Sequence, residues 1–388
     1  MLSQGGKKRM AKVNTIVIWG LREWDAPTVG RTRYLAECFA QLGKRTFFVV
    51  PPPQHKIPVR HSEFWQFRKK ALKSPVRQLN GVTIIHPMPC PLPYAHHYAP
   101  LRWLRAIFLG KQLQTFLGSV ESTVLIVCDP KEWSLLRWWR SRGGISVYDC
   151  ADLMSAFQGA GDRVARDELK AISEASLVTC SSKGLMEHIT ARFPKKFVIL
   201  VRNGIHWRRF QQNGETPSIL KIIPQPRIGF VGSISYWIDI HLINEVARVR
   251  PQWHFVFVGP LKTQWNERPS NVYILPPISP DEVPLYLRGI DVGLVPFVDS
   301  PLTRCVNPLK LYEYLACGKP VVATPYGDFE DVEEWVYFGE TPDTFAQAIH
   351  RALEEDSAVL QRARIQAAKE ADWINRTSNF LVELERKV

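Results

Sequence analysis

The chain has 388 residues, of which 45% are hydrophobic and 22% are charged, and its formal net charge is +13. This length suits two domains, and the composition excludes a disordered chain, a collagen-like repeat and a coiled coil. No apolar run is long enough to span a bilayer, and the basic start of the chain lacks the apolar stretch of a secretory signal. We therefore expect neither a transmembrane helix nor a signal peptide.

From residue 14 onward, short β-branched runs alternate with helical stretches, which predicts βαβ units and a mostly parallel sheet. The predicted strands of the first half are residues 15–19, 46–50, 82–85, 124–128, 145–148, 177–180 and 197–201. The predicted helices between them are residues 31–42, 101–117, 131–142, 163–175 and 183–192. Helices in these positions would cover both faces of the sheet.

A second βα series follows a polar, proline-containing stretch that is typical of a linker. Its predicted strands are residues 227–231, 254–258, 272–275, 292–296, 320–323 and 336–338. Its predicted helices are residues 240–249, 280–288, 308–317, 342–355, 358–373 and 374–386. The pattern predicts an α/β protein with domains at 13–207 and 227–372, a linker at 208–226, and a final helix within 373–388 that could pack across the junction.

The charge is divided unevenly between the halves. Residues 1–207 hold 31 Lys and Arg against 14 Asp and Glu, a balance of +17, whereas residues 208–388 hold 19 against 23, a balance of −4. Such a division indicates that one half meets an anionic surface. The seven cysteines are odd in number and show no C-x-x-C spacing, which favours a reducing cytoplasm.

Two common nucleotide signatures are missing. No Gly-Lys pair is followed by Ser or Thr, so the chain has no Walker A motif. No G-x-G-x-x-G follows the first predicted strand. These absences disfavour a P-loop nucleotidase and a nicotinamide enzyme, so two Rossmann-like halves need a different ligand.

The most informative segment is residues 307–324, which predicts a loop, a helix and a strand in succession. Asn307 can cap the helix, Pro308 suits its first position, and Gly318 is placed to end it. Lys310 would lie in the first turn, where free backbone N–H groups attract anions, with Glu313 on the same face. Lys310 could thus hold a diphosphate and Glu313 a ribose diol. The alternative is an exposed Lys–Glu pair on a surface helix.

Three segments together resemble a known family. The block Pro308-x-Lys310-x-x-Glu313-Tyr-Leu-Ala-x-Gly318-x-Pro320-Val-Val is similar to the donor-nucleotide motif of GT-B glycosyltransferases (family 4-like, glycosyltransferase group 1), especially bacterial ones that build surface polysaccharides. Residues 228–235, Ile-Gly-Phe-Val-Gly-Ser-Ile-Ser, resemble the first strand and loop of the donor domain. Residues 203–205, Asn-Gly-Ile, resemble the turn that closes the acceptor domain.

This resemblance implies a GT-B fold of two Rossmann-like, doubly wound domains that face each other across a cleft. A nucleotide sugar, by expectation a UDP-sugar, would bind the C-terminal domain. A glycan or lipid-linked saccharide would bind the N-terminal domain as acceptor. The donor-binding residues that the resemblance implies are Gly30, Gly232, Ser233, Arg304, Pro308, Leu309, Lys310 and Glu313.

Individual residues in this set have structural alternatives. Gly232 could serve the turn alone, and Arg304 could be a solvated loop residue. Tyr236 and Trp237 stand where relatives often have a basic residue, so they either contact the donor or pack in the core. One position departs from the family pattern, because retaining enzymes often have a second Glu where this chain has Cys305. A retaining mechanism is therefore in doubt.

Two carboxylates follow the fifth predicted strand, at the end where open α/β sheets place ligands. An inverting displacement needs a base that takes the proton of the acceptor hydroxyl. Asp152 lies where retaining relatives often show a His, so we predict Asp152 as this base and Asp149 as the second candidate. The alternative for each is a helix cap or a loop residue.

No metal or other cofactor is expected, since the acidic loop at 328–331 is the only Asp-x-Asp-like pattern and the histidines form no metal-ligand spacing. Basic and aromatic residues interleave in residues 55–77 and again in residues 101–117. This mixture suits an anionic membrane surface, where each Lys or Arg contributes about 1 kcal/mol. A solvated basic surface is the alternative, and no nucleic-acid motif accompanies the charge.

The sequence therefore predicts a cytoplasmic glycosyltransferase, peripheral to the inner face of the cell membrane, that acts in polysaccharide biosynthesis. A catalytically silent GT-B relative that serves as a membrane-surface scaffold or binding module is the second hypothesis, motivated by Cys305 and by the missing basic residue near Tyr236. A sugar-nucleotide epimerase on the same fold is disfavoured by the basic N-terminal half.

Overall fold

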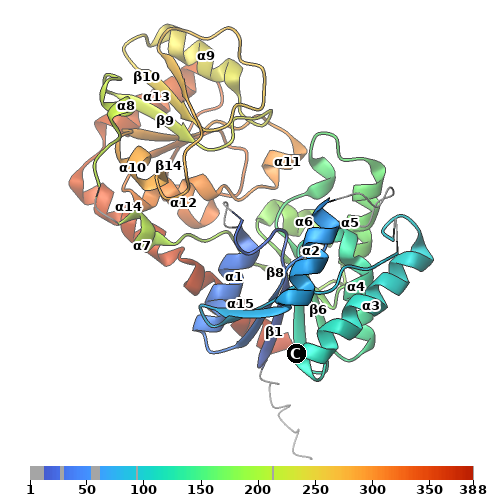
Figure 1. The fold of residues 1–388 in the computed structure, drawn as a ribbon. Coiled ribbons are helices and arrows are strands. Elements are labelled where there is room, and N and C mark those ends of the chain that lie inside the picture. Colours follow the sequence, from blue (N-terminus) through green and yellow to red (C-terminus); the bar gives the residue numbers. More distant parts are fainter. Residues whose placement is uncertain (1–12, 27–29, 54–61, 93–94, 212–213, 388) are drawn as a thin grey trace, which may run out of the picture. The chain divides into compact units, whose positions relative to one another are not determined.

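The computed structural model describes residues 13–26, 30–53, 62–92, 95–211 and 214–387 (Figure 1). The chain divides into two compact units. Unit 1 comprises Met1–Cys180, Met186–Val201 and Thr377–Val388, and unit 2 comprises Ser181–Leu185 and Arg202–Arg376. The division falls inside two helices, α6 (Lys183–Arg192) and α15 (Trp373–Lys387), so the last helix of the chain contributes residues to both units.

Unit 1 contains an eight-stranded sheet in the order β3-β4-β2-β1-β5-β6-β7-β8. Every neighbouring pair is parallel except β3 with β4. The strands are β1 (Thr15–Trp19), β2 (Arg45–Val49), β3 (Val76–Leu79), β4 (Val82–Ile85), β5 (Thr123–Val127), β6 (Ile145–Cys150), β7 (Leu177–Cys180) and β8 (Val198–Leu200). The central strands are buried almost throughout, as expected for a sheet that is covered on both faces.

Helices cover both faces of this sheet. They are α1 (Arg31–Gln41), α2 (Ser62–Lys73), α3 (Ala99–Leu117), α4 (Trp133–Ser141), α5 (Asp162–Glu174) and α6, with short 3-10 turns at Pro130–Glu132 and Met154–Ala156. Right-handed crossovers place α3, α4 and α5 on one face, where they lie together in Figure 1. On the other face, Phe39 of α1 meets Phe380 of α15 with ring centroids 5.7 Å apart.

All seven strands predicted for the first half are present. The sequence reasoning missed α2, which lies inside the basic segment 55–77, and β3, which begins at the end of it; that segment was interpreted only for its charge. Helix α2 buries Phe64 and Phe67 on one side and exposes Trp65 and Lys69 on the other. This amphipathic spacing was the available signal.

Unit 2 contains a six-stranded, fully parallel sheet in the order β11-β10-β9-β12-β13-β14. Its strands are β9 (Arg227–Val231), β10 (His254–Val258), β11 (Val272–Leu275), β12 (Val292–Val295), β13 (Val321–Ala323) and β14 (Val336–Phe338). Its helices are α7 (Trp207–Phe210), α8 (Ser218–Lys221), α9 (Ile240–Val249), α10 (Val283–Arg288), α11 (Pro301–Arg304), α12 (Leu309–Ala316), α13 (Pro342–Glu354) and α14 (Ala358–Glu370), with a 3-10 turn at Glu330–Trp335. All six predicted strands are present.

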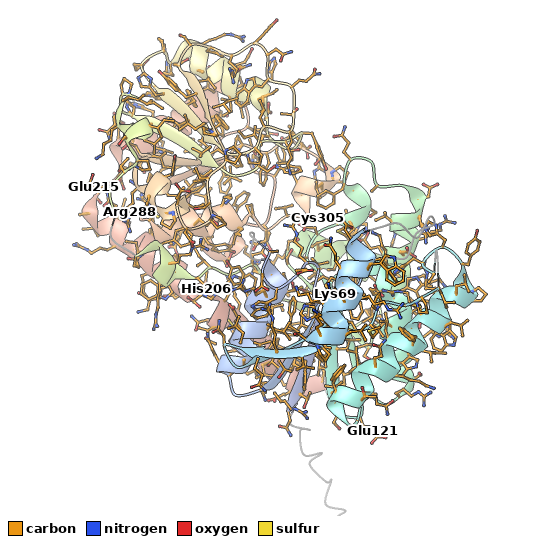
Figure 2. The ribbon with its side chains drawn as sticks, in the orientation of Figure 1. Lys69, Glu121, His206, Glu215, Arg288 and Cys305 are labelled. Atoms are coloured by element: carbon orange, nitrogen blue, oxygen red, sulfur yellow. The ribbon has the colours of Figure 1, made fainter. Side chains whose placement is uncertain are left out.

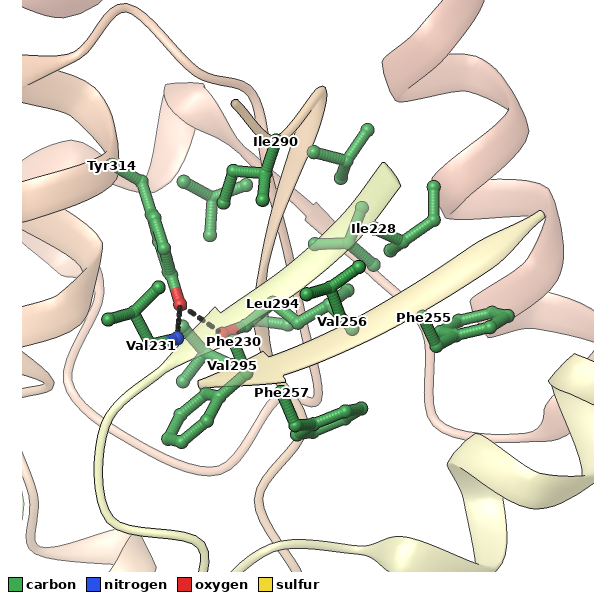
Figure 3. Packing of buried hydrophobic residues seen from close by; sticks show 14 of the residues in the cluster. Ile228, Phe230, Val231, Phe255, Val256, Phe257, Ile290, Leu294, Val295 and Tyr314 are labelled. Carbon is green, nitrogen blue, oxygen red and sulfur yellow. Dashed lines mark hydrogen bonds between the residues drawn. The ribbon is translucent and has the colours of Figure 1, made fainter. Parts of the chain in front are cut away.

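The core of unit 2 joins the sheet to α12 through Tyr314 (Figure 3). The Tyr314 hydroxyl donates to the carbonyl oxygen of Leu294 at 3.1 Å and accepts from the Val231 amide at 3.4 Å. A side chain at Gly293 would clash with the tyrosine ring, because its Cβ would lie 2.4 Å from Cγ of Tyr314. Helix α12 is thereby fixed to β12 at close range.

The stretch expected as a linker, residues 208–226, differs from that expectation. It carries part of α7 and all of α8, and Phe210, Leu220 and Ile223 are buried in the core of unit 2. These three apolar side chains, spaced among polar residues, explain why the segment packs.

Candidate functional site

In the unit 2 sheet, the strand order reverses between the neighbouring strands β9 and β12. Open α/β sheets bind ligands outside the carboxyl ends of the strands at such a point. The loops that follow these strands are hydrogen-bonded to each other. The Asp239 amide donates to the Pro296 carbonyl at 2.8 Å, and the Val298 amide donates to the Trp237 carbonyl at 2.9 Å. A fixed backbone frame therefore surrounds this end of the sheet.

The two predicted donor segments meet at this frame. A Cβ built on Gly232 would lie 3.1 Å from Cε of Lys310, so the loop after β9 contacts the first turn of α12. The Ser233 hydroxyl in the same loop is buried and has no hydrogen-bond partner among the described residues. Free polar groups beside a lysine suit the oxygens of a phosphate.

Gly259, after β10, completes this frame and was not identified from the sequence. Its φ is +140°, and a Cβ there would lie 2.1 Å from the Gly232 carbonyl oxygen. Only glycine tolerates both conditions. The Gly259-Pro260 dipeptide after a strand was the available signal, because such pairs mark turns.

Lys310 and Glu313 form an ion pair with Nζ and Oε2 2.7 Å apart. Their side chains are 25% and 13% exposed, so the pair is largely buried rather than lying on an open surface as the alternative supposed. A lysine held in this way keeps two further N–H donors for an anion.

The predicted helix cap was wrong in detail. The N-cap of α12 is Pro308, which makes no side-chain cap, and Leu309 is the first helical residue. The Asn307 amide group is used elsewhere, because its Oδ1 accepts from the Asn203 amide and its Nδ2 donates to the Tyr312 hydroxyl and the Asp328 carbonyl. Asn307 thus ties the predicted Asn-Gly turn to α12. Gly318 ends the helix with φ +71°, as predicted.

Arg304 is mostly solvated. Its Nε and Nη2 donate to the two carboxylate oxygens of Asp299 at 2.6 and 2.7 Å, and its side chain is 67% exposed. This contact raises the pKa of Arg304 and lowers that of Asp299. Cys305 is buried, and its carbonyl accepts from the Ser182 hydroxyl at 2.7 Å (labelled in Figure 2).

In unit 1, Asp149 has a structural role that argues against its use as a base. Arg31 donates to both of its oxygens at 2.9 and 3.1 Å, Thr179 donates to Oδ1 at 2.7 Å, and the Cys128 thiol donates to Oδ2 at 3.2 Å. Burial alone would raise the pKa of Asp149, but Arg31 and the hydrogen bonds lower it below its usual value. A carboxylate so well satisfied is a weak proton acceptor.

Asp152 has the opposite environment. It lies two residues beyond β6, is partly buried, and its carboxylate has no hydrogen bond or ion pair among the described residues. Burial raises the pKa of Asp152 to about 6, with Arg31 opposing and Asp149 adding to the rise. Such a carboxylate is ionised near neutral pH and basic enough to accept a proton.

The remaining predicted residues have these positions. Gly30 is the N-cap of α1, and an added Cβ there would meet no atom of the described residues within 4 Å. Ser235 is buried, and Trp237 packs against the unit 2 core with its ring 5.0 Å from that of Tyr236. The acidic loop is used internally, since Arg202 pairs with Asp328 and Glu330.

Part of the predicted basic surface is buried instead. Arg102 and Arg105 of α3 are internal and pair with Asp167 and Glu132, so they cannot face a membrane. Lys56 and Arg60 lie outside the described residues. On α2, the side chain of Lys69 is exposed (Figure 2).

Three further observations concern the described residues. None of their helices is both long and apolar enough to cross a membrane. They contain no cluster of three or more His, Cys, Asp or Glu side chains suited to a metal ion. All seven cysteines are free thiols, and six of them are buried.

Comparison with known proteins shows which family and which fold this chain resembles. Residues 225–355 match the family model described as Glycosyl transferases group 1. Sucrose-phosphate synthase from Thermosynechococcus elongatus superposes on 96% of this chain and 98% of its own, with a TM-score of 0.67 at 14% identity. HepE from Anabaena, solved with UDP, covers 96% and 100% with a TM-score of 0.63 at 14% identity. The chain has the GT-B fold.

A curated relative of this GT-B protein is TuaH of Bacillus subtilis (strain 168), named for a glycosyltransferase role in teichuronic acid biosynthesis. It is 32% identical over 251 residues, which are 58% of this chain and 63% of the relative. The fold and family resemblance predicted from the motif block is confirmed. The family model covers the segment that holds Gly232, Lys310 and Glu313.

Proposed function

We propose that this GT-B protein is a glycosyltransferase that moves a sugar from a UDP-sugar to a glycan or lipid-linked acceptor in polysaccharide biosynthesis. The observation that carries the proposal is the meeting of the Gly232 loop with the Lys310–Glu313 pair at the carboxyl ends of β9 and β12. The UDP bound to HepE and the teichuronic acid role named for TuaH support the donor and the pathway class.

In this site Lys310 would hold the diphosphate, and its N–H donors would stabilise the charge that develops on the leaving group. Glu313 would accept hydrogen bonds from the ribose hydroxyls. The Ser233 hydroxyl, which has no partner among the described residues, would complete the phosphate contacts, and the missing side chain of Gly232 would allow the ligand to approach the backbone closely.

The chemistry proposed for Asp152 is a direct displacement. The acceptor hydroxyl oxygen forms a bond to the anomeric carbon, while the bond from that carbon to the diphosphate oxygen breaks. The bonding electrons leave with UDP, and the hydroxyl proton passes to the Asp152 carboxylate, whose raised pKa suits this transfer. Cys305, in place of a second glutamate, favours this inverting route.

The test is a calorimetric panel of UDP, GDP, ADP and dTDP on the wild type and on Glu313→Ala. We expect UDP to bind with the highest affinity and the Glu313 variant to lose about tenfold or more, the range for a lost hydrogen bond to a charged group. Glu245→Ala, which removes an exposed carboxylate from α9, is the matched control. If none of the four nucleotides binds the wild type, the proposal fails.

A peripheral membrane position is the finer part of this proposal. The outer face of α2 exposes Trp65, Lys69, Leu72 and Lys73, a mixture of aromatic, apolar and basic groups that suits a headgroup layer. Reversing Lys69 and Lys73 to Glu should release the protein from phosphatidylglycerol vesicles in a sedimentation assay. Reversing the exposed Arg192 and Lys195 to Glu, outside residues 55–77 and 101–117, is the control, and equal sedimentation of all variants would count against this surface.

The scaffold hypothesis keeps one specific observation in its favour, which is the absence of a glutamate at Cys305. It predicts vesicle binding without turnover of any nucleotide sugar. Release of UDP that depends on an acceptor would eliminate it.

A further inference from the structure

A cavity of about 350 Å³ lies in unit 1, at the carboxyl ends of β1 and β2. It is formed mainly by residues 21–24, which follow β1, and by Gly30, Thr32 and Arg33 at the start of α1, with Phe48 of β2 as one wall. The strand order of the sheet reverses between β1 and β5, so the cavity lies beside this point, and open α/β sheets bind ligands outside the carboxyl ends of such strands. The volume suits one saccharide unit better than a nucleotide.

The wall of this cavity holds a buried donor that has no partner. Trp24 lines the cavity with a residue exposure of 1%, and its indole N–H has no acceptor among the described residues. Its ring is held edge-on to Phe48 with centroids 5.0 Å apart. A buried donor of this kind is rare in folded proteins unless a ligand or water satisfies it.

Arg33 lines the same cavity and is held in position by three contacts. Its guanidinium carbon lies 4.9 Å from the centre of the Trp24 ring, its Nη1 donates to the Trp24 carbonyl at 3.0 Å, and its Nε donates to Glu37 at 3.1 Å. An arginine has five N–H donors, so the Nη2 group and one hydrogen of Nη1 are left over.

The charge around the cavity favours an anion. Arg22 and Arg33 line it as cations, and Glu37 offsets part of the charge of Arg33 through an ion pair at 3.1 Å. Among the described residues of the lining, Glu23 is the single acidic one, and Lys70 of α2 pairs with it at 2.8 Å. The next acidic residue of the loop, Asp25, pairs with Arg77. Both carboxylates of this loop are thus already used by the basic segment.

We propose that this cavity receives an anionic group of the acceptor, a carboxylate or a phosphate carried by a saccharide, and that Arg33 is the residue that recognises it. The proposal rests on the proposed function, since it assigns the acceptor subsite of the same reaction. The Trp24 N–H would donate to an oxygen of the same ligand. Arg33 would select anionic over neutral acceptors, because a neutral sugar leaves its free donors unpaired.

The test measures binding of four probes to the full chain by calorimetry: glucuronic acid, glucose 1-phosphate, inorganic phosphate and methyl glucoside. We expect the two anionic sugars to bind the wild type more tightly than methyl glucoside does. Arg33→Gln should weaken both anionic sugars about tenfold to a hundredfold, as for a lost hydrogen bond to a charged group, and leave methyl glucoside unchanged. Arg142→Gln is the matched control, because Arg142 also stacks on a tryptophan, Trp138 at 5.7 Å.

A second variant does not depend on the packing of Arg33. Leu21 lines the cavity with 51% exposure, so Leu21→Glu places a negative charge at the rim and should repel both anionic sugars. Leu104→Glu is its control, because Leu104 is equally exposed at 51% on α3.

The two sources of the anion are separated by the probes. Preference for glucuronic acid identifies a sugar carboxylate, and preference for glucose 1-phosphate or phosphate itself identifies a phosphate group. The inference is overturned if methyl glucoside binds as tightly as the anionic sugars, or if Arg33→Gln and Leu21→Glu bind them like the wild type. UDP binding is measured on the same samples, so intact UDP binding with an overturned cavity leaves the proposed function standing.

Discussion

Charged side chains near the carboxyl ends of the two sheets are held by partners at very different separations along the chain. In unit 2, Lys310 pairs with Glu313, only 3 positions along the chain. In unit 1, Asp149 is held by Arg31, 118 positions away, and by Thr179, 30 positions away. A pair within one helical turn is visible as a motif, whereas a network spread over several strands is not. The carboxylate of Asp152, three residues from Asp149, has no hydrogen bond or ion pair among the described residues, so two carboxylates that look alike in the sequence have opposite environments.

Replacement of Asp152 is expected to have the largest effect. Asp152→Asn removes the proposed proton acceptor and should lower the transfer rate by about 10² to 10⁴, the usual contribution of a general base. UDP affinity should be unchanged. In the wild type, the rate should fall as the pH drops through about 6, because Asp152 is then protonated. Steady-state kinetics between pH 5 and pH 8 would measure both effects, about where such a base titrates.

Asp162→Asn, at the exposed start of α5, is the control for this change. Full activity in the Asp152 variant would refute the assignment. A rate that does not respond to pH near 6 would indicate a different base.

The same substitution at Asp149 should damage stability instead. Asp149→Asn leaves Arg31 buried without its counter-charge, and breaking such a pair costs about 3 to 5 kcal/mol of unfolding free energy. Urea unfolding at neutral pH would measure the loss. Asp152→Asn should not lower stability, since burial disfavours the ionised form of Asp152 and so raises its pKa.

With rising pH, the ionisation of Asp149 and that of Asp152 change the unfolding free energy in opposite directions. The lowered pKa of Asp149 gives stability that is present above the usual pKa of an aspartate and is lost as pH falls through the folded value. The raised pKa of Asp152 costs stability as pH rises from the usual value through about 6. Equal unfolding free energies for both variants would contradict this distinction.

This contrast explains what could be predicted from the sequence. The thirteen strands predicted for the two halves are all present, since β-branched runs between turn residues are local signals. The Lys310–Glu313 pair was also predictable, because helical spacing fixes it. The role of Asn307 was not, since its partners Asn203 and Asp328 are distant in the chain.

The burial of Arg102 and Arg105 was unpredictable for the same reason. A basic residue in a helical pattern is usually solvated, and only the fold brings Asp167 and Glu132 to these two arginines. The basic half is thus partly an internal ion-pair network. The first half therefore has less positive charge available at its surface to bind a membrane than its composition suggests.

Two glycines sharpen the comparison of the units. Gly259→Ala in unit 2 forces a side chain into the left-handed region against the Gly232 carbonyl, which should cost about 1 to 3 kcal/mol and weaken UDP binding. In Gly30→Ala of unit 1 the new Cβ meets no atom of the described residues within 4 Å, so the stability of this variant should be unchanged. Thermal unfolding would measure the stability of each variant, and calorimetry would measure its affinity for UDP.

If Gly30 allows close approach of a ligand, as the sequence predicts, Gly30→Ala will lower the transfer rate without loss of stability. Unchanged kinetics for Gly30→Ala would show that this glycine serves only the start of α1. A stable Gly259→Ala protein with normal UDP affinity would contradict the frame described for unit 2.

The smallest expected effect is at Tyr314, which fixes α12 to the sheet (Figure 3). Burial raises the pKa of Tyr314, so its hydroxyl stays protonated and donates to Leu294. Tyr314→Phe keeps the ring against Gly293 but loses this bond, which should cost about 0.5 to 1.5 kcal/mol of unfolding free energy. Tyr337→Phe, whose hydroxyl bonds to Glu355 at the surface, is the control and should change little. Because Lys310 and Glu313 stand on the same helix, a loss of UDP affinity in Tyr314→Phe that exceeds its loss of stability would show that the hydroxyl positions the donor site; equal losses would assign it to packing alone.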